Sequence, residues 1–352
     1  MSKIVPALTA VLLLAACTST PSAESNGPAS PGGTVTLVTY DSYAISKATL
    51  KEFTQRTGQT VDVVRAGDAA EVVNRAILTK SAPEGDVLFG VDNNLLSRAL
   101  GEELFVPYTA AGLDQVPAEF RLDPENHVTP IDLGDVCVNY DREYFDANNV
   151  RVPKSLADLA DPAYRDLLVV ENPATSTPGL AFLLATVAEF GPEGFTDYWT
   201  RLRQNGVQVE NSWDAAYYKR FSGGSGGGDR PLVVSYASSP PAEVVFSDEP
   251  PAQAPTGVLL DTCYRQIEFA GLLANAPNPA GGQELIDFML TSTYQEDLPL
   301  NNFVFPVLPK TELPKVFKEN ADMAEEPLAL PPTEVAANRD TWVAAWIDAV
   351  AR

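Results

Sequence analysis

The chain has 352 residues, of which 45% are hydrophobic and 20% charged, the proportions of a soluble globular protein rather than of a disordered or collagen-like chain. Its 24 lysines and arginines stand against 47 aspartates and glutamates, a net charge of −23, which repels phosphate backbones and argues against nucleic-acid binding. The single histidine, His127, excludes a multi-histidine metal centre. A neutral or cationic ligand suits such a chain best.

The amino-terminal residues have the features of a bacterial export signal. One positive charge precedes an apolar run at 4–16, which is too short to span a bilayer. The run ends in Leu-Ala-Ala-Cys, which resembles a lipobox and predicts a lipoprotein signal peptide at 1–17 with Cys17 acylated. An ordinary signal peptide with a chance cysteine is the alternative. Residues 18–33, rich in Ser, Thr, Pro, Gly and Ala, are predicted to be a disordered tether.

Residues 34–130 are predicted to form the first part of lobe I, an α/β lobe. Strands are expected at 34–40, 60–64 and 86–90, and helices at 45–57 and 71–79. Alternating strands and helices favour a mainly parallel sheet, in which ligands collect at the carboxyl ends of the strands. The polar residues at those ends are Tyr40, Asp41, Asp68 and Asp92.

Lobe II is predicted to begin at residue 131 and to repeat the same organisation. Strands are expected at 136–140, 167–171 and 231–236, and a helix at 180–190. Thr175 and Ser176 precede this helix, where hydroxyls and free N–H groups could hold phosphate or hydroxyl oxygens; a plain helix cap is the alternative. The glycine-rich segment 222–228 lacks the Lys-Ser/Thr of a P-loop and is predicted to be a flexible surface loop.

A late strand indicates that the chain returns to lobe I. A strand at 258–269, a helix at 282–293 and an aromatic loop at 301–307 follow lobe II. The chain is therefore expected to cross between the lobes more than once and to form a hinge, with 34–130 and 255–308 in lobe I and 131–254 and 309–352 in lobe II. The last helix, from residue 332, places Trp342 and Trp346 on one face, where both are predicted to be core residues.

Two cysteines remain after Cys17, namely Cys137 and Cys263. An exported chain folds in oxidising surroundings, so a Cys137–Cys263 disulfide is predicted. Two buried free thiols are the alternative.

Six segments, taken in order, resemble the thiamine-binding subgroup of periplasmic solute-binding proteins, the capture components of ATP-driven importers. They are 39–44 (TYDSYA), 90–96 (GVDNNLL), 175–180 (TSTPGL), 213–217 (WDAAY), 232–236 (LVVSY) with Ser239-Pro240, and 333–337 (TEVAA) with Arg339, Trp342 and Trp346. The resemblance implies an α/β, two-lobed periplasmic-binding-protein fold of type II, the Venus-flytrap, with a hinge between the lobes. It also implies an extracytoplasmic monomer that binds thiamine or its phosphate esters and delivers them to an ABC permease, and the lipobox-like sequence at Cys17 adds a lipid anchor to the membrane.

The resemblance assigns roles to individual positions of the chain. Tyr40, Tyr236 and Trp213 match aromatic positions around the ligand rings, Asp68 matches an acidic position near the aminopyrimidine, and Thr175 with Ser176 matches hydroxyls around the phosphate end. The full set of expected ligand contacts is Tyr40, Asp41, Asp68, Asp92, Thr175, Ser176, Trp213, Tyr217, Tyr236 and Phe303. Phe303 stands where other members have tryptophan, and Ala242 replaces another aromatic, so a lighter aromatic cage is expected.

The chemistry of these residues suits thiamine, whose thiazolium is a permanent cation, because aromatic faces attract cations and an aspartate accepts from an amine. Within the same fold, an iron(III) binder using Tyr217 and Tyr218 as phenolates and a polyamine binder are the alternatives. An enzyme is not expected: neither Ser176 nor Ser239 lies in a Gly-x-Ser-x-Gly elbow, although abundant carboxylates leave glycosidase chemistry open by counting alone. No metal and no cofactor are expected, and thiamine would be cargo.

Overall fold

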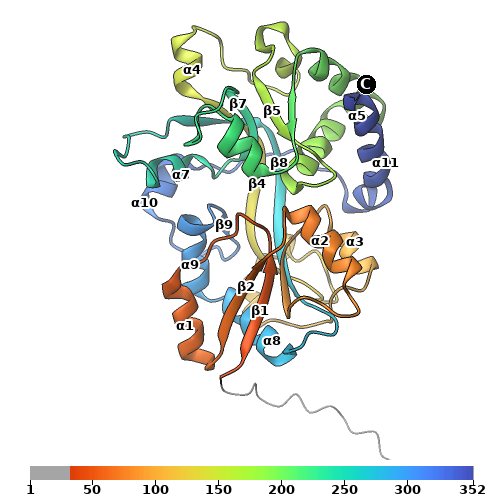
Figure 1. Cartoon of the computed structure of the whole chain (residues 1–352), viewed down its shortest axis with the longest axis vertical. Helices are drawn as coiled ribbons and strands as arrows, with labels where there is room; N and C mark the ends of the chain where they lie inside the picture. Colours follow the sequence, from red (N-terminus) through yellow and green to blue (C-terminus); the bar gives the residue numbers. More distant parts are fainter. Residues whose placement is uncertain (1–31, 352) are drawn as a thin grey trace, which may run out of the picture.

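The computed structural model describes residues 32–351, so the predicted signal peptide with Cys17 and nearly all of the predicted tether lie outside the described residues. Two α/β lobes are stacked along the long axis of the molecule and joined by two long strands (Figure 1). The chain ends in the upper lobe, beside α5. This arrangement confirms the predicted two-lobed α/β fold.

The strands are β1 (Thr34–Thr39), β2 (Thr60–Arg65), β3 (Val87–Asp92), β4 (Thr129–Asp141), β5 (Leu168–Glu171), β6 (Gln208–Glu210), β7 (Leu232–Tyr236), β8 (Thr256–Leu272) and β9 (Phe305–Pro306). The helices are α1 (Lys47–Thr57), α2 (Ala69–Leu78), α3 (Leu96–Gly101), α4 (Arg142–Ala147), α5 (Thr177–Gln204), α6 (Trp213–Ala215), α7 (Pro240–Val245), α8 (Pro279–Met289), α9 (Ser292–Asn301), α10 (Lys315–Asn320) and α11 (Pro332–Ala351). A π-helical turn, η5 (Ala216–Arg220), follows α6. Short 3-10 turns lie at Leu113–Gln115, Ala118–Phe120, Asp158–Ala160 and Pro162–Tyr164.

The sheet order is β2-β1-β3-β8-β4-β7-β5-β6, with β9 paired to β4. β1 is parallel to β2 and β3, and β5 is parallel to β6 and β7, so each lobe has the predicted parallel sheet. β8 is antiparallel to both β3 and β4. The two parallel sheets are thus joined through an antiparallel pair in the middle of the molecule.

Strands β4 and β8 belong to both lobes. They pair from Thr129 opposite Ala270 at one end to Asp141 opposite Thr256 at the other. β4 pairs with β7 in the upper lobe, and β8 pairs with β3 in the lower lobe. The chain therefore crosses between the lobes along both strands, as predicted for a hinge. The predicted lobe boundaries at 131 and 255 fall close to the starts of these shared strands, and the precise division of the chain stays a prediction.

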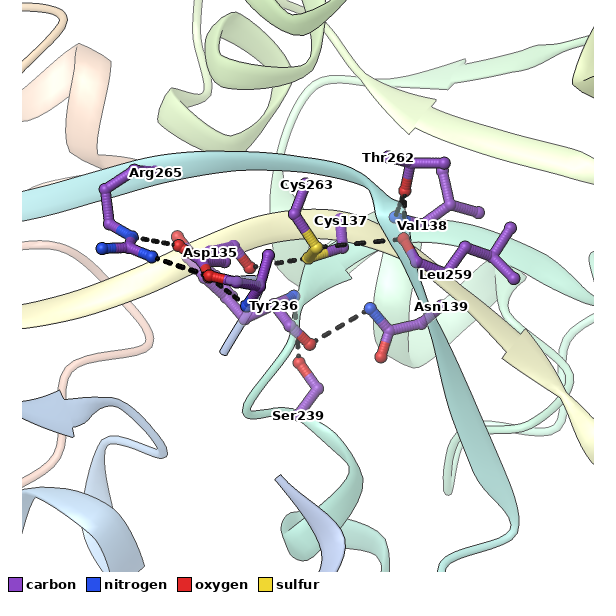
Figure 2. The surroundings of a disulfide bond; sticks show 11 residues. Asp135, Cys137, Val138, Asn139, Tyr236, Ser239, Leu259, Thr262, Cys263 and Arg265 are labelled. Atoms are coloured by element: carbon purple, nitrogen blue, oxygen red, sulfur yellow. Dashed lines mark hydrogen bonds and ion pairs between the residues drawn. A yellow bond between two sulfur atoms is a disulfide. The ribbon is translucent and has the colours of Figure 1, made fainter. Parts of the chain in front are cut away.

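The disulfide Cys137–Cys263 is present and ties β4 to β8, which confirms the predicted bridge (Figure 2). The pairing of the two strands shifts register between Val136 and Val138, next to the bridge. Asp135, fully buried, forms an ion pair with Arg265 across the same two strands. The centre of the hinge is thus held by a covalent and an ionic link.

Among the predicted elements, three show the largest differences from the structure. β4 is longer than predicted because it lies between two partners, β7 and β8, along its length. The predicted helix 282–293 is wrong as one element: α8 ends at Met289 and α9 starts at Ser292, because Thr291 adopts an extended backbone and its hydroxyl donates to the carbonyl of Phe288. The first half of α5 ends where predicted, because Gly191 has a non-helical backbone with φ 74°, but the second half, which continues to Gln204, was not predicted.

The C-terminal tryptophans are core residues, as predicted. Trp342 and Trp346 are buried on α11, and the Trp346 ring meets the edge of Trp199 on α5 with 5.5 Å between centroids. These rings fasten the end of the chain to lobe II and lie away from the cavity described below.

Candidate ligand-binding cleft

A cavity of about 270 Å³ lies between the lobes, close to the lower end of the roughly 300–1,000 Å³ typical of small-molecule sites. Its walls are lined by Tyr40, Asp41, Ser42, Ala44, Asp68, Ala69, Glu268, Asn301, Asn302, Phe303 and Val304 from lobe I and by Thr177, Pro178, Ser212, Trp213, Asp214, Tyr217, Tyr218, Tyr236, Ser239, Ala242 and Phe246 from lobe II. The lining combines aromatic rings and carboxylates with small polar groups. It contains no lysine, arginine or histidine among residues 32–351.

The lobe II wall is a cluster of aromatic rings around Trp213, the first residue of α6. Trp213 stacks on Tyr217 with 4.9 Å between centroids and an interplanar angle of 18°, and Tyr218 meets its edge at 5.3 Å. The indole Nε1 donates to Ser235 Oγ at 2.9 Å. The hydroxyl of Ser212 caps α6 by accepting from the N–H of Ala215. The Trp213 ring is therefore fixed in orientation before any ligand arrives.

Two tyrosine rings of the cavity lie directly against glycines of strands β3 and β4. A Cβ on Gly90 would sit 2.5 Å from the Tyr40 ring, and one on Gly134 would sit 2.9 Å from the Tyr236 ring. Gly90 also has φ 107°, a conformation that favours glycine. Only a residue without a side chain lets each ring approach the sheet this closely, so these glycines set the depth of the cavity.

The Tyr40 hydroxyl links the two ends of the lobe I wall. It donates to Glu268 Oε2 at 3.1 Å and accepts from Asn302 Nδ2 at 2.9 Å. Burial raises the pKa of Tyr40 and of Tyr236 well above the ordinary value, with the nearby carboxylates adding to the shift. Both side chains are therefore neutral phenols at physiological pH.

Asp68 connects the two lobes across the cavity. It caps α2 by accepting from the N–H of Ala69 at 2.8 Å, and its other oxygen accepts from the N–H of Trp213 at 3.1 Å. Burial raises the pKa of Asp68 to about 6, opposed by the backbone N–H groups of Trp213, Ala69 and Thr177, the last of them at the start of α5. The two lobes are thus in contact through the Asp68 carboxylate. This carboxylate lies at the start of α5, where the sequence predicted that phosphate or hydroxyl oxygens of a ligand could bind.

Most of the predicted contact residues are brought together. Seven of them line the cavity: Tyr40, Asp41, Asp68, Trp213, Tyr217, Tyr236 and Phe303. Asp92 does not, because it is fully buried and accepts from the N–H groups of Asn94 and Leu95. Thr175 donates to the carbonyl of Asn211 at 2.7 Å instead. Ser176 is buried directly before Thr177, the first α5 residue at the cavity wall.

The expected thiamine contacts left out several lining residues, namely Asp214, Tyr218, Phe246, Glu268 and Asn302; of these, only Tyr218 had been considered, as a ligand of iron(III). Phe246 meets the edge of Phe303 with 5.5 Å between centroids. Phe246 lies one helical turn after Ala242, the alanine that replaces an aromatic residue of other family members. Its ring therefore supplies an aromatic side chain near the position where the sequence predicted none. The sequence did contain a signal that could have identified Glu268, because this charged residue lies among the apolar residues of 267–273.

The glycine-rich segment 222–228 lies at the surface, as predicted, with Ser225, Gly226 and Gly227 exposed, and it also packs against η5. A side chain on Gly226 or Gly228 would overlap the backbone of Tyr218 or Arg220. The segment therefore supports η5, the turn that carries Tyr217 and Tyr218.

Among residues 32–351, no helix has the length and apolarity needed to cross a membrane. Within the same range, no group of three or more His, Cys, Asp or Glu side chains is arranged to hold a metal ion.

Comparison with known proteins identifies the family. The family model for bacterial extracellular solute-binding proteins matches residues 83–325. The chain belongs to this family. As a member of it, this solute-binding protein acts outside the cytoplasm, and the predicted resemblance is confirmed.

Individual relatives share most of their length with this solute-binding protein. The thiamine-binding periplasmic protein of Brucella suis is 32% identical over 334 residues, covering 91% of this chain and 92% of the relative. A solved structure of a periplasmic thiamin binding protein superposes with a TM-score of 0.80 at 26% identity, covering 91% of this chain and 96% of the other. A more distant relative is iron uptake protein A2 of Synechocystis, 25% identical over 279 residues, covering 76% of this chain and 78% of the relative.

Proposed function

We propose that this solute-binding protein captures thiamine or its phosphate esters in the interlobe cavity and delivers them to the permease of an ABC importer. The observation that carries the proposal is a cavity with aromatic faces from both lobes, several carboxylates and no cationic side chain among the described residues. Thiamine offers the complementary features, two flat rings and a permanent positive charge. Aromatic faces attract such a cation by roughly 0.5–2 kcal/mol each.

The arrangement of the tyrosines argues against iron(III). The Tyr217 hydroxyl donates to Glu243 at 2.9 Å and its ring is covered by Trp213. Burial raises the pKa of Tyr217 well above its ordinary value, whereas a ferric ligand must be a phenolate. A polyamine would use the carboxylates but leave the stacked ring surface of Trp213 without a flat partner. Thiamine uses both features.

Isothermal titration of the purified protein tests the proposal. Thiamine, its monophosphate, its diphosphate, spermidine and ferric citrate are titrated under identical conditions. We expect at least one of the thiamine forms to bind with a Kd near nanomolar, about −12 kcal/mol, and spermidine and ferric citrate to bind far more weakly. Tighter binding of spermidine or iron than of every thiamine form would contradict the assignment.

We further propose that the protein is a monomer held at the membrane by a lipid on Cys17. The support is the Leu-Ala-Ala-Cys sequence and the Ser- and Pro-rich segment after it. Cys17→Ser is expected to move the protein from the membrane fraction to the soluble fraction or medium, as measured by immunoblotting of fractionated cells. Membrane retention of this variant would argue against lipidation. The proposal assigns no catalytic role and no cofactor.

A further inference from the structure

The floor of the cavity holds a carboxyl group to which no role has been given. Glu268 lies on β8, 5% exposed, and lines the cavity. Its Oε2 accepts from the Tyr40 hydroxyl at 3.1 Å and its Oε1 from Gln266 Nε2 at 3.2 Å. Glu268 is therefore oriented by two donors while it faces the space where a ligand would lie.

A second carboxyl stands directly beside it. Asp132 on β4 is the cross-strand partner of Glu268 and is fully buried. Neither of its carboxyl oxygens accepts from an N–H or O–H donor among the described residues, and the Glu268 carboxyl group lies within hydrogen-bonding reach of it. Two ionised carboxylates this close and this deeply buried are unfavourable, so one of them retains a proton.

The surroundings contain little positive charge to offset the pair. The groups that act on Glu268 are Tyr40, which follows β1, Asp92 from β3, Asp132 from β4, Gln266 from β8 and Tyr236 from β7. Among these groups, none is cationic; Arg339 of α11 acts on Asp92. An ionised Glu268 therefore has no cationic partner among these groups, and a proton or a bound cation would neutralise it.

We propose that Glu268 is the counterion for the positive charge of the ligand, with Asp132 holding a proton beside it, so that capture of a cation releases a proton from Glu268 to solvent. The O–H bond of the Glu268 carboxylic acid breaks, its electron pair stays on the carboxylate, and the cation takes the place of the proton as the neutralising charge. The inference rests on the proposed function and adds a specificity-determining residue to it.

The direction of the pH dependence follows from the protonation states. Burial raises the pKa of Glu268 to about 7, with Asp92 adding to the shift, while burial and Glu268 raise the pKa of Asp132 above its ordinary range. A bound cation favours the ionised form of Glu268 and lowers its pKa. Affinity for a cation should therefore fall as pH drops through about 7 and level off above it, because below that pH the proton must first be removed.

Titration calorimetry with thiamine over about pH 6.5–8.5, in buffers of different ionisation enthalpy, tests the inference. This window lies above the pKa of about 6 of Asp68, so Glu268 dominates the change. The wild-type protein is expected to bind thiamine about fourfold more weakly at about pH 6.5 than at about pH 8.5. Near pH 7 it is expected to release about half a proton for each thiamine bound. Absence of both effects in a protein that binds thiamine would overturn the inference.

The variant Glu268→Gln keeps the size of the side chain and an acceptor for Tyr40 but cannot be ionised. It is expected to weaken thiamine binding at least tenfold at the upper limit of the pH range and to abolish both the pH dependence and the proton release. Asp261→Asn, an exposed position of the same strand, is the matched control and should keep both. Unchanged behaviour of Glu268→Gln would also overturn the inference.

The two proposals fail in different ways. If the wild-type protein binds no form of thiamine at any pH, the proposed function is wrong. If it binds thiamine without proton release, the function stands and the role of Glu268 is wrong. Because the proton count is measured on the wild-type protein, the test holds even if Glu268→Gln does not fold.

Discussion

Removing the Cys137–Cys263 bridge is expected to lower the free energy of unfolding by up to about 5 kcal/mol. The bond closes a loop with a sequence separation of 126 residues, and a link over so long a loop restricts the unfolded chain strongly. The double variant Cys137→Ala/Cys263→Ala avoids a free thiol. Urea unfolding followed by fluorescence should show a lower midpoint than in the wild type, with a change in slope if the unfolded chain expands.

The bridge can also be opened without mutation. Wild-type protein unfolded in the presence of a reductant should match the double variant in urea midpoint, and the reductant should have no effect on the double variant. Intact mass after alkylation of unreduced, unfolded protein should show no modification of Cys137 or Cys263. Two alkylated thiols, or equal midpoints for the wild type and the double variant, would contradict the expected stabilisation.

Trp213→Ala is expected to weaken thiamine binding by roughly 1–3 kcal/mol, about five- to a hundredfold, because a buried ring contributes apolar contact and cation–π attraction together. Trp213 is half-buried and is the first residue of the short helix α6, so folding should be affected less than binding. Calorimetry with thiamine and thermal melting of the same samples measure the two effects separately.

Trp346→Ala is the matched control, since Trp346 is a buried ring packed on Trp199 and distant from the cavity lining. It should lower stability by roughly 3–5 kcal/mol and leave thiamine affinity per folded molecule unchanged. The reverse pattern, with Trp213→Ala lowering the melting temperature sharply while affinity stays the same, would show that Trp213 belongs to the core rather than to the site.

Local sequence patterns were sufficient for most of the secondary structure. Alternating β-branched residues and a closing glycine define β1 and α1 within a few residues of their observed ends. The break between α8 and α9 was not predicted, because apolar spacing continues across it and only the backbone of Thr291 interrupts the helix. The fold class followed from the alternation of strands and helices together with six segments shared with a family.

The candidate site was predictable where it lies at strand ends. Tyr40 follows β1 and Tyr236 ends β7, positions that a parallel sheet exposes to a ligand. The same reasoning was misleading for Asp92, because that carboxylate turns back to accept two backbone N–H groups of its own turn. A polar or aromatic residue at a strand end is thus a candidate ligand contact. Its local hydrogen bonds decide whether the side chain faces the cavity.

The sequence by itself predicted the export signal, and it was sufficient for the family, the two-lobed architecture and the aromatic residues of the cleft. Each of these depends on the order of residues within short segments of the chain. Only the tertiary structure placed Asp68 against Trp213 of the other lobe and Glu268 beside Asp132 at the floor. Both contacts join residues more than a hundred positions apart. They arise from how the lobes approach each other and from the register of β4 with β8, and neither is expressed in the local order of residues.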